Sequence, residues 1–131
     1  MKFACLVYID EALMAAMTPE EGRKLTDDTI EEDWQLRQSG RLILAQPLQR
    51  PETAVTIRLR GGTLAATDGP FAETKEHLGG FFLIEAKDIA EAQAIAAESA
   101  ILPYGSIEIR PFLEQTHSVT GQDRPPPGGA T

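Results

Sequence analysis

The sequence predicts an α+β fold whose elements follow the order strand, helix, strand, hairpin, strand, helix, strand. Two observations carry this prediction. Apolar or alternating runs of strand length are interleaved with two longer helical patterns. Each helical pattern begins at a side chain that can cap a helix, Thr18 in one and Asp88 in the other. The length of 131 residues suits a single domain with a sizeable core.

The N-terminal part reads as a strand followed by a connector. Residues 3–9 are nearly all apolar, which is typical of a central strand covered on both faces. Residues 10–17 change from polar to apolar and could contain a short helical turn.

The first helix is expected from Pro19 to about Ser39. Thr18 and Glu21 have the spacing of a capping box, and Pro19 occupies the first helical position. Gly40 follows the last turn, where a glycine often ends a helix. The helix has an apolar stripe that contains Leu25, Ile30 and Trp34. These side chains are expected to pack in the core, and for Trp34 a platform for a ligand is the alternative.

The middle of the chain predicts an edge strand and a hairpin. Residues 42–48 form a second strand, and Pro47 places it at a strand end or a sheet edge. Residues 54–60 alternate cleanly between apolar and polar side chains, Gly61-Gly62 signals a tight turn, and residues 63–67 return.

The second half predicts a buried strand at 81–86, a helix at 89–101 and a last strand at 106–113. Asp88 and Glu91 have the spacing of a second capping box. From position 114 to 131 the chain is rich in proline and glycine and has too few apolar residues to pack as a core, so we expect a disordered or polyproline tail after a domain of residues 1–113.

Reduced to essentials, the order is βαββαβ, the ferredoxin-like arrangement, with an extra hairpin before residue 68. Both helices would then cover one face of an antiparallel sheet. The other face needs cover, and a two-fold homodimer with sheet against sheet is the simplest solution.

Composition excludes several classes of protein. The net charge of −8 and the pI of about 4.7 disfavour direct nucleic-acid binding and binding to an anionic membrane. The one cysteine, Cys5, lies in an apolar run and is expected to be buried, which fits a reducing compartment. No apolar run is long enough to span a membrane and no signal peptide is visible, so the cytoplasm is the expected location.

Residues 68–85 are the stretch richest in turn-forming, charged and titratable residues. Asp68 can accept hydrogen bonds from the backbone of a turn, and Gly69-Pro70 is a turn sequence that Phe71 would anchor. Charged and titratable side chains follow, and then a glycine pair that indicates a bulge or a close approach of another backbone or a ligand. These residues are Glu73, Lys75, Glu76, His77, Gly79 and Gly80. The alternative is an ordinary turn with a solvated charged face.

Arg58 and Arg60 lie on one face of the strand at 54–60. In so acidic a chain they could bind a carboxylate or a phosphate. Pairing with glutamate, across the sheet or between subunits, is the simpler interpretation.

The motif resembles the signature of the DGPF, or YCII-related, family. The resemblance covers about residues 1–113 and rests on 67–76 (TDGPFAETKE), 78–81 (LGGF), 39–42 (SGRL) and 104–111 (YGSIEIRP). It implies a dimeric α+β barrel in which two sheets enclose a pocket. It also implies a protein partner of the sigma-factor type, because some relatives are associated with alternative sigma factors.

The wider group includes members suspected of catalysis through a His–Asp pair, which this sequence lacks. Residues 19–39 contain no histidine, and Leu102 stands before Pro103-Tyr104 where the aspartate is expected. The shared motif therefore directs attention to Asp68, Glu73, Lys75 and Glu76.

The preferred hypothesis is a dimer with a pocket for a small organic molecule near residues 68–80, with or without proton transfer. Asp68 or Glu73 would be the base, with a pKa raised by burial. Lys75 would stabilise the negative charge that develops during proton transfer, and His77 is a second candidate acid or base. No nucleophilic triad, metal site or cofactor is expected. The alternatives are a protein-binding module and a purely architectural dimer motif. The expected ligand-binding residues are Tyr8, Arg58, Phe71, Glu76, Gly79 and Gly80.

Overall fold

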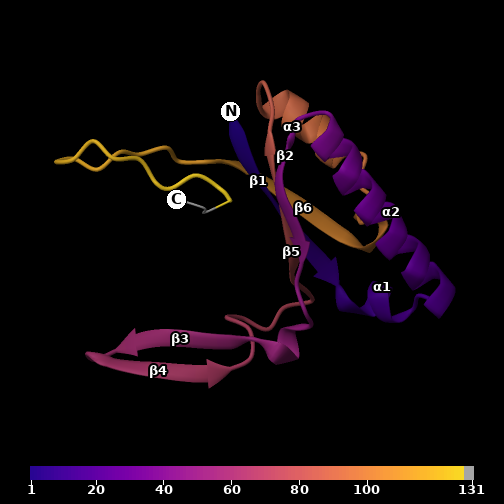
Figure 1. Cartoon of the computed structure of the whole chain (residues 1–131). Helices are drawn as coiled ribbons and strands as arrows, with labels where there is room; N and C mark the ends of the chain where they lie inside the picture. The colour runs from indigo at the N-terminus through magenta and orange to yellow at the C-terminus, as the bar shows by residue number, and fades with distance from the viewer. Residues whose placement is uncertain (129–131) are drawn as a thin grey trace.

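The computed structural model describes residues 1–128 and confirms the α+β class. A four-stranded antiparallel sheet carries the helices on one face, and a separate two-stranded sheet stands away from it (Figure 1). Within residues 1–128, no helix is both long and apolar enough to cross a bilayer.

The main sheet has the order β2-β5-β1-β6 and places the two most apolar strands at its centre. Its strands are β1 (Lys2–Asp10), β2 (Leu42–Pro47), β5 (Glu76–Glu85) and β6 (Gly105–Pro111). Phe3, Cys5 and Ile84 are completely buried between this sheet and the helices. Burial raises the pKa of the Cys5 thiol to about 12, in agreement with the buried cysteine that the sequence predicts.

Two helices begin at the caps that the sequence predicts: Thr18 caps α2 (Pro19–Gln38) and Asp88 caps α3 (Ile89–Ala96). The short helix α1 (Glu11–Ala15) is capped by Asp10, which the sequence analysis did not identify as a cap. The capping box of α2 is complete. The one predicted for α3 is not, because the Glu91 carboxylate accepts from Lys87 N and not from Asp88 N. Two short 3₁₀ segments complete the helical elements, η1 (Pro51–Thr53) and η2 (Leu102–Tyr104).

Replacing Thr18 by alanine is expected to lower the free energy of unfolding by about 1 kcal/mol. The change removes the oxygen that accepts from Glu21 N at 3.1 Å. Urea unfolding followed by circular dichroism measures the loss. Thr26→Ala is the matched control, because its hydroxyl only bonds back to Gly22 O within α2 and should cost less than half as much.

The predicted stripe of α2 is largely wrong. Leu25 packs against the core, but Ile30 and Trp34 are 50% and 63% exposed. The side of α2 that faces the sheet instead carries Leu25, Thr29, Glu32 and Leu36, which follow helical spacing but include polar residues. A stripe chosen by hydrophobicity alone could not identify this side.

Two element boundaries also differ from prediction. Strand β5 begins at Glu76, five positions before the expected 81, because residues 76–80 pair with the end of β1. Helix α3 ends at Ala96 and gives way to turns and η2, so the expected helix at 89–101 is too long. Pro103 lies in η2, and its missing N–H is compatible with the start of that 3₁₀ turn.

The hairpin of β3 (Val55–Arg60) and β4 (Thr63–Asp68) forms as expected around Gly61-Gly62. Both turn glycines have positive φ, 55° and 81°, which other residues rarely adopt. Figure 1 shows that the hairpin and the C-terminal tail project from the side of the sheet opposite the helices.

The tail is exposed but has local order that composition did not predict. Thr116 and Asp123 form an isolated bridge, and the ring of His117 accepts from Val119 N and Thr120 N. The remainder of the predicted tail, residues 129–131, lies outside the described residues.

Candidate functional site

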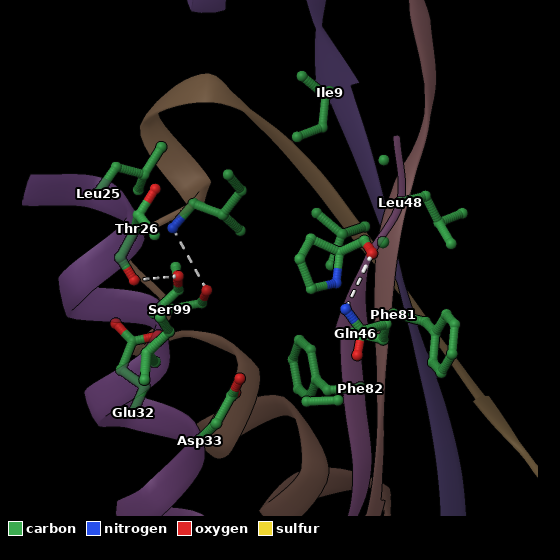
Figure 2. Close-up of a pocket in the computed structure, with 18 of the residues that line it drawn as sticks. Ile9, Leu25, Thr26, Glu32, Asp33, Gln46, Leu48, Phe81, Phe82 and Ser99 are labelled. Atoms are coloured by element: carbon green, nitrogen blue, oxygen red, sulfur yellow. Dashed lines mark hydrogen bonds between the residues drawn. The ribbon is translucent and has the colours of Figure 1, made fainter. Parts of the chain in front are cut away.

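A cavity of about 680 Å³ lies between α2 and the helix-side face of the sheet. Figure 2 shows Leu25, Thr26 and Glu32 on the α2 side of the cavity, with Ser99 beside them, and Ile9, Gln46 and Phe82 on the sheet side. The walls are mostly apolar, which is typical of small-molecule pockets. Further wall residues are Val7, Met14, Thr29, Ile30, Asp33, Ile95 and Ile101.

The motif reaches this cavity through the first residues of β5. His77, Gly79 and Gly80 line it. Gly79 is the extra residue of a bulge, because Val7 pairs with Gly80 and Tyr8 with Leu78. A Cβ at Gly79 would lie 2.4 Å from Ile9 Cγ1, and one at Gly80 would lie 3.0 Å from Gln46 O. The glycine pair therefore permits close packing at the cavity wall, as the sequence indicated.

His77 lies in a cluster with Glu11 and Arg50 at one end of the cavity. Its Nε2 is 3.4 Å from a Glu11 carboxylate oxygen, and its side chain is only 14% exposed. The other Glu11 oxygen is 2.7 Å from Arg50 Nη2. Because Glu11 belongs to α1 and Arg50 follows β2, three separate segments position one acid–base pair at the cavity.

Two carboxylates of α2 border the cavity on the helix side. Burial raises the pKa of both Glu32 and Asp33 above the ordinary values of these groups. For Glu32 the neighbouring carboxylates of Asp33, Asp28 and Glu98 act in the same direction, while a hydrogen bond from Ala100 N at 2.8 Å opposes them.

Other predicted site residues lie on the opposite, open face of the sheet. Tyr8 OH is 3.5 Å from a Glu108 oxygen, and Ser106 Oγ donates to Glu76 at 3.3 Å. Lys75 Nζ lies 3.6 Å from the carboxylate of Asp10, which is buried. Tyr8 and Glu76 are therefore separated from His77 and the glycines by the thickness of the sheet, while Lys75 lies just before β5, beside the end of β1.

The remaining predicted residues lie at the hairpin. Arg58 donates to Phe71 O at 3.2 Å and stacks on the Phe71 ring at 4.7 Å, so the glutamate pairing expected for it does not form within the described chain. Asp68 and Glu73 are exposed, so neither is a buried base within one chain.

The turn at Gly69 is also held differently from expectation. Gly69 has φ 106°, which explains the glycine. Its bonds come from other residues: Gly69 N donates to Ala54 O at 2.7 Å, and Thr56 Oγ1 donates to Gly69 O at 2.9 Å. Among residues 1–128, Asp68 accepts none of the hydrogen bonds that hold the turn.

Sequence reasoning missed Glu11, Glu32 and Asp33. The sequence pattern places Glu11 in a connector and gives the two α2 residues no role. The available signal was the spacing of Leu25, Thr29, Glu32 and Leu36, which places Glu32 on the same side of the helix as two apolar residues.

Comparisons with known proteins show the family of this chain. The profile of the YCII-related domain matches residues 1–116, so the chain belongs to the YCII-related family, as the DGPF motif predicted. It is also similar to the uncharacterized protein R00369 of Rhizobium meliloti (strain 1021). The two are 35% identical over 114 residues, which is 86% of this chain and 92% of that protein.

Proposed function

We propose that this YCII-related chain is a dimeric small-molecule-binding protein whose ligand occupies the cavity between α2 and the sheet. One observation carries the proposal: the motif strand supplies His77, Gly79 and Gly80 to a largely apolar hollow of about 680 Å³. This volume fits a small organic molecule.

Proton transfer is the chemistry that the cavity residues would support. A histidine ring beside a carboxylate is a common general acid–base arrangement, and Glu11 would hold the His77 ring in place. Arg50, in contact with the same carboxylate, would hold Glu11 in this orientation. The pair differs in position from the His–Asp pair suspected in the wider group.

The dimer is part of the same proposal. The strand order β2-β5-β1-β6 supports the ferredoxin-like arrangement, and the open face of the sheet carries apolar side chains that need cover. Leu44 and Leu78 on that face are 47% and 42% exposed. A second copy facing this sheet would complete an α+β barrel.

Filling the cavity is expected to abolish binding. Thr29→Trp adds a large side chain at a half-buried cavity position of α2, and ligand affinity should fall at least tenfold. The measurement is a small-molecule panel screened by ligand-observed NMR. Gln38→Trp is the matched control, because Gln38 is exposed near the end of the same helix.

Unchanged binding by Thr29→Trp would contradict the site. His77→Gln separates the two parts of the proposal: it should keep binding and lose any turnover found for a bound compound. A His77→Gln protein that keeps both binding and turnover would show that His77 has no role in catalysis.

An architectural role of the motif has its own support. Lys75 and Glu76 contact Asp10 and Ser106, which ties the motif to β1 and β6 within one chain. A protein partner of the sigma-factor type is the other alternative, and the exposed apolar face of the β3–β4 hairpin favours it.

A further inference from the structure

The cavity has an excess of negative charge that its own cations do not offset. Four carboxylates line it, those of Glu11, Glu32, Asp33 and Glu98, against the guanidinium groups of Arg41 and Arg50. Both guanidinium groups already contact carboxylates other than Glu32 and Asp33. Arg50 contacts Glu11 at 2.7 Å and Glu52 at 3.0 Å, and Arg41 lies 3.9 Å from Glu91.

The carboxylates of Glu32 and Asp33 are the ones available to a ligand. Neither has a Lys or Arg partner within 4.0 Å among residues 1–128. Both are partly removed from water, and the charged groups around Glu32 are acidic: Asp33, Asp28 and Glu98. A positive charge placed here would relieve this repulsion and recover part of the desolvation cost.

The surroundings indicate what kind of cation fits. Phe82 faces the α2 carboxylates from the sheet (Figure 2), and Leu25, Ile9 and Ile101 continue the apolar wall. Within the described part of the chain, no group of three or more potential ligands is arranged to hold a metal ion. The site therefore combines an apolar surface with two carboxylates, which suits an organic ammonium group on an apolar body.

We infer that the cavity binds an organic cation, with its ammonium group between Glu32 and Asp33 and its apolar body against Phe82 and Ile9. This inference rests on the proposed function, since it names the ligand class of the same site.

Three probes of equal chain length test it: octylamine, octanol and octanoate, measured by isothermal titration calorimetry at pH 7. Octylamine, present as octylammonium, is expected to bind at least tenfold tighter than octanol, and octanoate more weakly than either. If octanol or octanoate binds as tightly as octylamine, the inference is wrong while the proposed cavity stands. If none of the three binds, the inference fails, and the absence of any hit in the wider panel would remove the proposed function with it.

Two isosteric variants locate the ammonium group. Asp33→Asn and Glu32→Gln should each weaken octylamine binding at least tenfold and leave octanol binding unchanged. The amide oxygen introduced by Glu32→Gln keeps an acceptor for Ala100 N, so the fold should survive. The control is Glu31→Gln, which removes the same charge from an exposed position of α2. Equal losses in all three variants would indicate general attraction to an acidic protein and overturn the assignment.

The pH dependence gives a further check on the same complex. Because the pKa values of Glu32 and Asp33 are raised, these carboxyls take up protons at a higher pH than ordinary ones. Octylamine affinity should therefore fall as pH is lowered from 7 toward 5, while octanol affinity stays constant. Octylamine affinity that does not change over this range would contradict the assignment.

Discussion

Replacing Gly105 by alanine is expected to lower the free energy of unfolding by about 3 kcal/mol or more. A Cβ at this position would lie 1.9 Å from Tyr8 O, 2.9 Å from Tyr8 C and 3.1 Å from Ile9 Cα. All three atoms belong to the backbone of the central strand β1, so no side-chain rotation can relieve the clash. The methyl group must push β6 away from β1 at the first pair of their ladder, Ile9 with Gly105.

The matched control, Gly22→Ala, is expected to increase stability instead. Gly22 lies inside α2, and a Cβ there would have no neighbour within 4 Å. Gly22→Ala should therefore raise stability by about 0.5–1 kcal/mol. Urea unfolding followed by circular dichroism measures both changes. A Gly105→Ala protein as stable as the wild type would show that β1 and β6 are not packed as closely as described.

The parts of the fold that the sequence could predict are those fixed by local chemistry. Thr18 and Asp88 each start a helix because their side-chain oxygens accept from a backbone N–H three residues ahead, and Gly61-Gly62 form a turn because both adopt positive φ. The structure confirms all three predictions. The exposure of Trp34 and the start of β5 could not be predicted, because they depend on contacts between segments distant in sequence. Nothing near Glu76 in the chain signals that it pairs with Asp10.

The residues of the candidate site also fall into those that local sequence identifies and those that depend on contacts between distant segments. The glycine pair and His77 lie in the stretch 68–85 that the sequence singles out, and the structure brings them to the cavity. Glu32 could not be assigned, because its role depends on α2 lying over the sheet. Likewise, sequence reasoning grouped Tyr8 with His77, yet the two lie on opposite faces of the sheet. A bulge at Gly79 shifts the register between them. The glycine pair indicated that a bulge could occur here, but the sequence does not show which side chains it moves to the other face.

An aspartate at Ile57 is expected to convert the proposed dimer into a monomer. The hairpin has one face of apolar side chains, and Val55, Ile57 and Leu59 on it are 62%, 66% and 71% exposed. Such a face on an isolated two-stranded hairpin needs cover, and the hairpin projects on the side where a second sheet would lie (Figure 1). Burying an unpaired carboxylate there would cost about 3–5 kcal/mol, which weakens association at least a hundredfold.

The control for this change is Thr63→Asp, which adds the same charge to the opposite face of the hairpin, beside Arg60. Sedimentation velocity over a range of concentrations measures the assembly of both variants, and both should keep the wild-type circular dichroism spectrum. A dimeric wild type that Ile57→Asp leaves intact would place the interface elsewhere. A monomeric wild type would remove the dimer itself, and the apolar hairpin face would then favour a different protein as the partner. Neither result decides the proposal for the cavity between α2 and the sheet, because the hairpin projects from the opposite side of the sheet (Figure 1).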